Sequence, residues 1–279
     1  MEKLGVVDVG GGMRDVYGAG IFDYCQDNQI RFDCCVGVSA GSANIASFLA
    51  GQRGRNYKFY MEYAFRKEYI SIGNWIRNRN FVNLDYSYGT LSNSDGECPL
   101  DYPALCGNPA QYIMVAANAL TGEPVYFDKS DLRQDAYHPI KASGTVPVAN
   151  KPFVIGQIPY YDGGIADPIP VKKCLETGCD RVVLILTRPK DSRRTPDKDR
   201  FPSRLLKHSY PNASRALAGR AELYNRQLEE AIRMEKQGTV LILAPDDIGQ
   251  MKTLTKDREV MERLYRKGYE DARQISEWL

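Results

Sequence analysis

The sequence predicts an α/β fold in which helices cover a mostly parallel sheet. Two observations carry this prediction. The first fifty residues alternate between apolar runs of strand length and segments with small and apolar residues at helical spacing. Two further apolar runs, 181–187 and 239–245, are separated by a long helical segment at 213–237. Such alternation favours a parallel sheet, because parallel neighbours need a crossover connection that is usually a helix.

The N-terminal elements are predicted in the order strand, loop, helix, strand, turn, helix. The run LGVVDVG at 4–10 has the composition of a buried strand, and glycines lead from it into a helical stretch within 13–28. A second strand is predicted at 32–38, and a helix is predicted to begin at Ala40. Residues 52–105 are aromatic-rich and irregular, so we expect an insertion or cap over the sheet.

The remaining elements are predicted from turn signals and apolar runs. Residues 111–120 and 124–129 are expected to form a hairpin, because Gly122 lies in the short connection between them. The last residues, 255–279, are predicted to be a C-terminal helix. The whole chain, 1–279, is predicted to be a single domain, since its length suits one large α/β domain.

Composition narrows the class of protein. The chain has 279 residues, a formal net charge of +2 and 43% apolar residues, which is typical of a globular protein. This charge gives no argument for a nucleic-acid partner, and none is predicted. The N-terminal apolar run is too short for a signal peptide, and no run approaches the roughly 18 apolar residues of a spanning helix. We therefore expect a cytoplasmic protein.

The cysteine and histidine content argues against a structural metal site. The seven cysteines form no C-x-x-C pair, and the sequence has two histidines. A structural zinc site usually needs four closely spaced ligands. We therefore expect reduced, mostly buried thiols, and we predict no catalytic cysteine, because no base-and-orienter arrangement lies near one.

The segment 188–207 is the most biased in charge. It holds eight lysine or arginine residues and three aspartates. One interpretation is a solvated loop. The alternative is peripheral contact with a membrane, where each basic residue can add about 1 kcal/mol of attraction to anionic headgroups.

A serine stands at the junction of the second predicted strand and the following helix. The stretch Gly37-Val38-Ser39-Ala40-Gly41 has the pattern G-x-S-x-G. Between a strand and a helix this pattern is typical of the nucleophile elbow, a tight turn that lifts the serine hydroxyl out of the sheet. The hydroxyl then stands at a helix N-terminus, whose free N–H groups favour developing negative charge. The alternative is a glycine-rich turn used only for packing.

Three consecutive glycines, Gly10, Gly11 and Gly12, follow the first predicted strand. Without side chains they can expose successive N–H groups to an anion, either a phosphate or an oxyanion. A dinucleotide-binding fingerprint would have the pattern G-x-G-x-x-G, but Asp15 occupies the place of its last glycine. A carboxylate is unfavourable beside a pyrophosphate, so we prefer the oxyanion interpretation.

The third motif is Asp162, followed by Gly163 and Gly164. Asp-Gly is a routine turn dipeptide, so the motif is weak by itself. A serine nucleophile, however, needs a base and an anion cradle, which Asp162 and the three-glycine loop can supply. His138 and His208 lie in no recognisable motif. The scarcity of histidine favours a Ser–Asp dyad, with a Ser-His-Asp triad as the alternative.

These three motifs, in this order and spacing, resemble the patatin-like phospholipase family. That family has a glycine-rich oxyanion loop near the N-terminus, then G-x-S-x-G, then Asp-Gly-Gly or Asp-Gly-Ala well downstream. The block ASGTVPV at 142–148 is similar to the small-residue block that ends in proline before the family's catalytic aspartate. Asp15 departs from the pattern, since many members carry glycine there. The resemblance covers about residues 4–170 and points to bacterial single-domain members.

The resemblance implies a three-layer α/β/α sandwich and a catalytic Ser–Asp dyad. By position, Ser39 is the nucleophile and Asp162 the base. The oxyanion hole would be formed by the loop Gly10–Gly12 and by Ala40, and Arg14 matches the family's basic position in that loop. Arg14 would hold the loop or meet an anionic group of the substrate. Such a mechanism needs no metal and no cofactor.

The predicted function is hydrolysis of lipid acyl esters, in phospholipids or lysophospholipids, through an acyl-enzyme on Ser39. Two alternatives stay open: an esterase or thioesterase for small soluble acyl groups, and a non-catalytic lipid-binding module. The aromatic segment 57–88 separates the two kinds of hydrolase. A groove from this segment to Ser39 would hold long acyl chains, whereas inward packing would admit only short ones.

Overall fold

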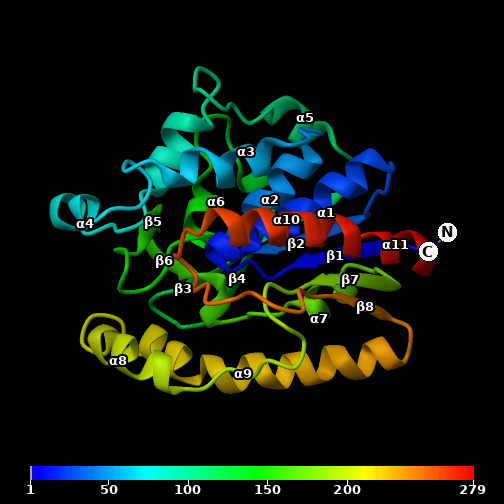
Figure 1. Cartoon of the computed structure of the whole chain (residues 1–279). Coiled ribbons are helices and arrows are strands. Elements are labelled where there is room, and N and C mark those ends of the chain that lie inside the picture. The colour runs from blue at the N-terminus through cyan, green and yellow to red at the C-terminus, as the bar shows by residue number, and fades with distance from the viewer. Residues whose placement is uncertain (1) are drawn as a thin grey trace.

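The computed structural model describes residues 2–279 and has an eight-stranded sheet between two layers of helices (Figure 1). The strands in chain order are β1 (Leu4–Asp8), β2 (Cys34–Val38), β3 (Gln111–Asn118), β4 (Pro124–Phe127), β5 (Phe153–Ile155), β6 (Ile158–Asp162), β7 (Arg181–Ile185) and β8 (Val240–Leu243). Their order in the sheet is β5-β6-β3-β2-β1-β7-β8, and β4 pairs with β3. The five strands from β3 to β8 in this order are parallel, while β4, β5 and β6 pair antiparallel. The predicted sandwich with a mostly parallel sheet is confirmed.

Helices cover both faces of the sheet (Figure 1). One layer contains α1 (Val16–Asp27), α2 (Ala40–Leu49), α3 (Arg55–Met61), α6 (His138–Ser143), α10 (Arg258–Asp271) and α11 (Arg273–Trp278); the other contains α7 (Val171–Glu176), α8 (Asp197–Leu206) and α9 (Pro211–Lys236). Within residues 2–279, no helix combines the length and the apolar character that a bilayer-crossing segment requires.

Successive side chains of the central strand β1 point to opposite faces of the sheet and pack against the two helix layers. Val6 of β1 belongs to a buried cluster with Leu264 of α10, whereas Val7 belongs to a second cluster with Leu228 of α9. Successive strand residues point to opposite faces, so a parallel strand that is covered on both sides is apolar throughout. The C-terminal helices therefore pack on the same sheet as the N-terminal elements. A hydrogen bond also connects them, because the hydroxyl of Tyr17 in α1 donates to the carboxylate of Asp271 in α10 at 2.8 Å.

The predicted insertion at 52–105 contains α3, α4 (Ile72–Asn78), α5 (Tyr102–Gly107) and a π-helical turn at Tyr86–Leu91. It lies on the α2 side of the sheet, and α4 projects from the body of the molecule (Figure 1).

Three parts of the structure differ from the sequence prediction. The segment 188–207 contains helix α8 rather than only a loop, and acidic residues in its first turn favour a helix N-terminus. The C-terminal helix is interrupted at Ala272 and forms α10 and α11. The hairpin of β5 and β6 was not predicted, because a three-residue strand leaves almost no periodic signal. It matters here because Asp162 is the last residue of β6.

Candidate active site

Ser39 occupies a strained turn between β2 and α2. Its backbone angles are φ 58° and ψ −126°, a conformation that side-chain-bearing residues seldom adopt. The flanking glycines make the turn possible. A Cβ on Gly37 would lie 2.5 Å from the Cα of Ser42, and a Cβ on Gly41 would lie 2.4 Å from the carbonyl oxygen of Asp8. Both glycines of the G-x-S-x-G pattern are thus required, because the neighbouring backbone approaches them too closely for a side chain.

A buried serine supports this turn. The backbone N–H of Ser39 donates to Oγ of Ser143 at 2.9 Å, and the hydroxyl groups of Ser42 and Ser143 lie 2.9 Å apart. Ser143 ends helix α6 and is fully buried. Ser143 lies in the small-residue block at 142–148 that the sequence analysis identified. No sequence pattern, however, predicted its contact with the elbow.

Asp162 is brought to Ser39 by the sheet. The residue ends β6, where it pairs with Ala116 of β3, and its carboxylate accepts the N–H of Gly164 at 2.8 Å. Gly163 is needed because a Cβ there would lie 2.3 Å from the carbonyl oxygen of Val115. Ser39 and Asp162 line one cavity of about 410 Å³.

The environment of Asp162 sets its basicity. Burial raises the pKa of this carboxyl above its usual value. A hydrogen bond with the Ser39 hydroxyl, the Gly164 N–H, and the guanidinium groups of Arg220 and Arg194 act in the opposite direction on that pKa. A carboxyl whose pKa is raised accepts a proton more readily than an exposed one, which suits a general base.

The three-glycine loop lies against the elbow. Gly10, Gly11 and Gly12 all have positive φ, of 65°, 145° and 61°. A Cβ on Gly10 would lie 2.2 Å from the carbonyl oxygen of Val38 and 3.0 Å from the N atom of Ala40. The Gly10 N–H donates to Oδ1 of Asp8 at 3.0 Å and is therefore already occupied.

The other two loop glycines face Ser39. They stand at the start of the 3₁₀-helix Gly12–Asp15, where N–H groups have no acceptor within the helix. Gly11 lines the 410 Å³ cavity, and Gly12 lines an adjoining one together with Ser39 and Ala40. Three N–H groups, those of Gly11, Gly12 and Ala40, can thus approach an anion beside Ser39.

Asp15 lies in the interior and lines neither cavity. Its carboxyl faces that of Asp8, and a Cβ on Gly18 would lie 2.7 Å from Asp15 Oδ1 and 2.8 Å from Asp8 Oδ2. Burial, together with the charge of Asp8, raises the pKa of Asp15 well above its usual range. Burial also raises the pKa of Asp8 to about 6. Both shifts favour the protonated form, and the Asp15 carboxyl faces Asp8 in the interior rather than the cavity beside the loop.

Basic side chains also line the 410 Å³ cavity that contains Ser39. Most come from segments after β7: Arg188, Arg193, Arg194, Lys198 and Arg220, joined by Arg14 of the glycine loop. Asp162 and Asp199 are the two carboxylates that line it. The basic bias of 188–207 was visible in the sequence, but its position beside Ser39 was not.

The adjoining cavity is apolar and narrow. Aromatic and aliphatic side chains of the insertion line it, among them Phe59, Tyr60, Tyr69 and Tyr88. Its free volume is about 50 Å³, far below the roughly 300–1,000 Å³ of sites for drug-sized ligands. The aromatic segment thus reaches Ser39 and packs inward.

Neither histidine belongs to the site. His138 begins α6 with its ring 5.5 Å from that of Phe153, and His208 is exposed after α8. Neither residue lines a cavity that contains Ser39.

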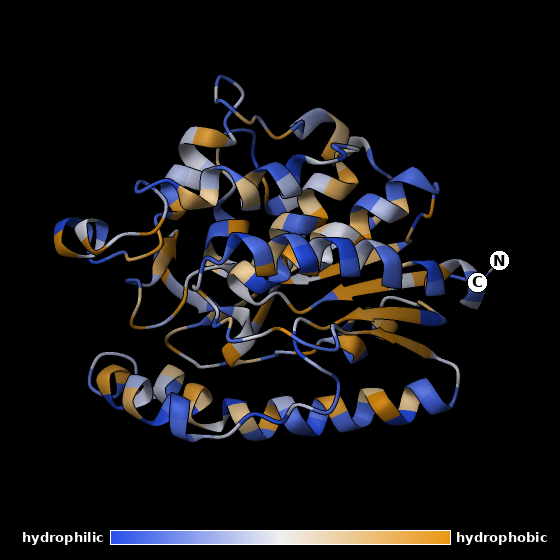
Figure 2. Ribbon diagram, viewed as in Figure 1, coloured by the Kyte–Doolittle hydropathy of each residue, from blue (hydrophilic) through white to orange (hydrophobic). Residues whose placement is uncertain are grey.

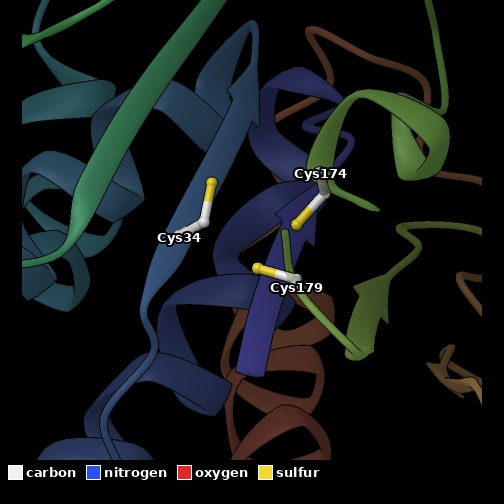
Figure 3. Close-up of side chains that lie close together, drawn as sticks. All are labelled: Cys34, Cys174 and Cys179. Atoms are coloured by element: carbon white, nitrogen blue, oxygen red, sulfur yellow. The ribbon is translucent and has the colours of Figure 1, made fainter. Parts of the chain in front are cut away.

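Three cysteines converge at the opposite end of the strands. The Sγ atoms of Cys34, Cys174 and Cys179 all lie within 4.8 Å of one another, and the three residues are buried (Figure 3). Cys34 begins β2, whereas Ser39 follows its end, so the two sites are separated by the length of the strand. Three thiolates can bind a soft metal ion, but within residues 2–279 no fourth cysteine, histidine, aspartate or glutamate belongs to the group.

Comparisons with known proteins agree with this architecture. A family model described as patatin-like phospholipase matches residues 9–175, which contain Ser39, Asp162 and the glycine loop. A second model, a domain of unknown function called DUF6363, matches residues 210–279, which contain α9, α10 and α11.

Two individual proteins are similar to this chain. The uncharacterized protein YjjU of Escherichia coli (strain K12) is 30% identical over 197 residues, which cover 70% of this chain and 54% of that protein. The chain thus spans about half the length of this curated relative. The crystal structure of VipD from Legionella pneumophila has a TM-score of 0.52 at 14% identity, over 99% of this chain and 67% of that one, and it supports the fold alone. By the match over 9–175, this chain belongs to the patatin-like phospholipase family, a family of lipid acyl hydrolases.

Proposed function

We propose that this protein is a serine hydrolase of lipid acyl esters, in which Ser39 is the nucleophile and Asp162 the general base. The observation that carries the proposal is that a strained serine, the carboxylate of Asp162 and Gly11 of the glycine loop line one cavity. Gly12 and Ala40 line the adjoining cavity together with Ser39. A nucleophile, a base and an anion cradle are the three parts that acyl transfer through a serine requires.

Acylation would begin when Oγ of Ser39 attacks the ester carbonyl carbon and its proton passes to the carboxylate of Asp162. The carbonyl oxygen becomes an oxyanion that accepts hydrogen bonds from the N–H groups of Gly11, Gly12 and Ala40. The tetrahedral intermediate then expels the alcohol, which takes the proton from Asp162. In deacylation Asp162 accepts a proton from the attacking water, and the collapse of the second intermediate returns that proton to Ser39 and releases the fatty acid.

The acyl group would occupy the narrow cavity beside the aromatic insertion. Its free volume of about 50 Å³ favours short acyl groups, so hydrolysis of small esters is the second candidate function. A series of p-nitrophenyl esters from acetate to palmitate tests this directly. A maximum of kcat/KM at short chains supports the small-ester function, and a maximum at long chains means that residues 57–88 move to admit the chain.

Peripheral membrane contact is proposed for 188–207. Two apolar side chains of α8, Phe201 and Leu205, are 68% and 53% exposed, and the exposed cations Lys198 and Arg204 lie next to them in the sequence. The ribbon of α8 accordingly shows both hydrophobic and hydrophilic residues (Figure 2). An apolar residue flanked by basic ones is the pattern of a helix that lies in the headgroup region of anionic lipid. Replacement of Phe201 and Leu205 by Ser should weaken co-sedimentation with anionic vesicles and leave soluble-ester hydrolysis intact. Equal co-sedimentation of both proteins would refute the contact.

The first test of the proposed function is covalent labelling. A fluorophosphonate probe should modify Ser39 alone, as mapped by mass spectrometry, because the probe reports an activated serine. Labelling should disappear in Ser39→Ala and persist in Ser209→Ala, a matched change at an exposed serine. A folded protein with an unlabelled Ser39 would contradict the proposal.

A further inference from the structure

The Ser39 cavity is lined by three arginines, Arg14, Arg188 and Arg194, whose buried Nε atoms lack a hydrogen-bond acceptor among the described residues. Buried polar atoms in folded proteins are almost always hydrogen-bonded. Three unpartnered guanidinium nitrogens that line one cavity therefore indicate a ligand that accepts hydrogen bonds.

Two of these arginines are held in place before any ligand binds. Arg14 is 2% exposed, and its Nη2 would lie 3.2 Å from a Cβ on Gly11, so its guanidinium lies beside the oxyanion loop. The guanidinium of Arg194 lies 4.6 Å from the ring centroid of Tyr224. The backbone of Arg194 exchanges two hydrogen bonds of 2.9 Å with the side-chain amide of Asn225. Such preorganisation lowers the entropic cost of binding.

Among the described residues, Arg193 and Arg220 of this cavity form ion pairs with Glu229 and Asp199, whereas Arg14, Arg188 and Arg194 form none within 4.0 Å. Burial, then the guanidinium groups of Arg188 and Arg194, lowers the pKa of Arg14 to about 9. Burial, then Arg220 and Arg188, lowers the pKa of Arg194 to about 10. Arg220 is satisfied by two hydrogen bonds to Asp199. The guanidinium groups of Arg14, Arg188 and Arg194 repel one another, so an anion between them relieves the repulsion.

We propose that Arg188 and Arg194, with Arg14 beside them, form a subsite for a phosphate group of the substrate, so that the preferred substrate is an acyl ester carrying a phosphate monoester and no cationic headgroup. This inference rests on the proposed hydrolase function, because it identifies the part of the substrate next to the scissile ester. Guanidinium groups bind phosphate oxygens through paired, charge-assisted hydrogen bonds. A choline or ethanolamine group would instead meet two further cations of the cavity, Arg193 and Lys198.

The test compares three esters of one short acyl chain: 1-hexanoyl-glycerol 3-phosphate, its phosphocholine analogue and 1-hexanoylglycerol. The short chain keeps all three monomeric and suits the narrow acyl cavity. For the wild-type protein we expect kcat/KM for the phosphate monoester to exceed that for each of the other two by about 10-fold or more, the effect of one or two hydrogen bonds to a charged group. Equal rates for the three esters would overturn the inference while leaving the hydrolase function intact.

Substitutions test whether Arg188 and Arg194 cause the preference for the phosphate monoester. In Arg188→Gln/Arg194→Gln the ratio of kcat/KM between the phosphate monoester and 1-hexanoylglycerol should fall toward one. Arg233→Gln removes an exposed cation of α9 outside the cavity and should keep the ratio. A ratio that survives in the double variant overturns the assignment.

Binding separates this inference from the hydrolase proposal. Calorimetry with the Ser39→Ala protein measures affinity for the intact phosphate monoester without turnover, so it works even if no ester is cleaved. Affinity that is at least tenfold weaker in Ser39→Ala/Arg188→Gln/Arg194→Gln supports the subsite. Inorganic phosphate serves as the competing anion. If it binds as tightly as the ester, the site takes a free phosphate and the substrate assignment is overturned.

Discussion

The two sides of the Ser39 cavity are built in opposite ways. One side consists of backbone held by glycines: the elbow, the three-glycine loop and the Asp162 turn all come from residues 9–175. The other side consists of long charged side chains, most of them from residues 188–220, which follow the Asp162 motif in the sequence. The first side admits little variation, because a Cβ on nearly every one of these glycines would collide with neighbouring backbone or, at Gly11, with the side chain of Thr187. The second can change its residues without changing the fold, so we expect chemistry to reside on the first side and substrate choice on the second.

The largest expected effect tests the glycine-built side. Ser39→Ala and Asp162→Asn should each lower kcat/KM for a neutral ester by about 10⁴-fold or more, because loss of a nucleophile or its base removes the covalent route. Circular dichroism and thermal unfolding should show that both variants are folded. A mild effect of Asp162→Asn combined with inactivation by His138→Ala would replace the dyad with a triad.

A smaller effect is expected from the residue that supports the elbow. Ser143→Ala removes the acceptor of the Ser39 N–H and should lower kcat by about tenfold with little change in KM, the usual effect of one buried hydrogen bond. The rate of fluorophosphonate labelling should fall in parallel, since the serine is then poorly positioned. Ser87→Ala is the matched control, because Ser87 is buried but its hydroxyl has no partner. Equal losses in the two variants would mean that Ser143 acts only through stability.

The two sides are also coupled electrostatically. Asp162 must be ionised to act as a base, so activity should be lost as pH falls through its pKa, which burial has raised. The positive charge of Arg194 lowers that pKa. Arg194→Gln should therefore move the acid limb of kcat/KM for a neutral ester to higher pH, while Arg233→Gln, a change at an exposed cation of α9, leaves the limb in place. An unmoved limb would show that Arg194 is too well screened to act on Asp162.

The smallest effect concerns stability beneath the glycine loop. The pKa of Asp8 is raised to about 6 and that of Asp15 further, whereas an aspartate in the unfolded chain titrates near 3.9. As pH rises above about 4, the unfolded chain releases protons that the folded pair retains, so the free energy of unfolding falls. Asp15→Asn cannot ionise and should make this fall shallower, by up to about 1.4 kcal/mol per pH unit. Urea unfolding from about pH 4 to about pH 8 measures it, and parallel curves for the two proteins would count against a shared proton.

The sequence predicted the parts of the molecule that depend on local rules. The alternation of strands and helices indicated a mostly parallel sheet covered by helices, and the family resemblance implied the three-layer sandwich. Glycine spacing marked the elbow and the loop. The sequence missed the hairpin of β5 and β6 and helix α8, because a three-residue strand has no period and the charges of 188–207 resemble a solvated surface. It included Gly10 among the oxyanion donors, although Asp8 occupies its N–H. From the sequence, the carboxylate of Asp15 argued against a phosphate near the loop, but in the structure this carboxyl faces the interior.

The sequence by itself therefore determined the fold class and the catalytic motifs proposed here, because a turn with positive φ or a close backbone contact restricts residue type at one position. Only the tertiary structure decided which distant side chains share the cavity. It placed Arg14 beside Arg188 and Arg194, closed the acyl cavity to about 50 Å³ with aromatic residues, and gathered Cys34, Cys174 and Cys179. These features depend on burial and on Coulomb interactions between segments far apart in the chain, and no local pattern records them.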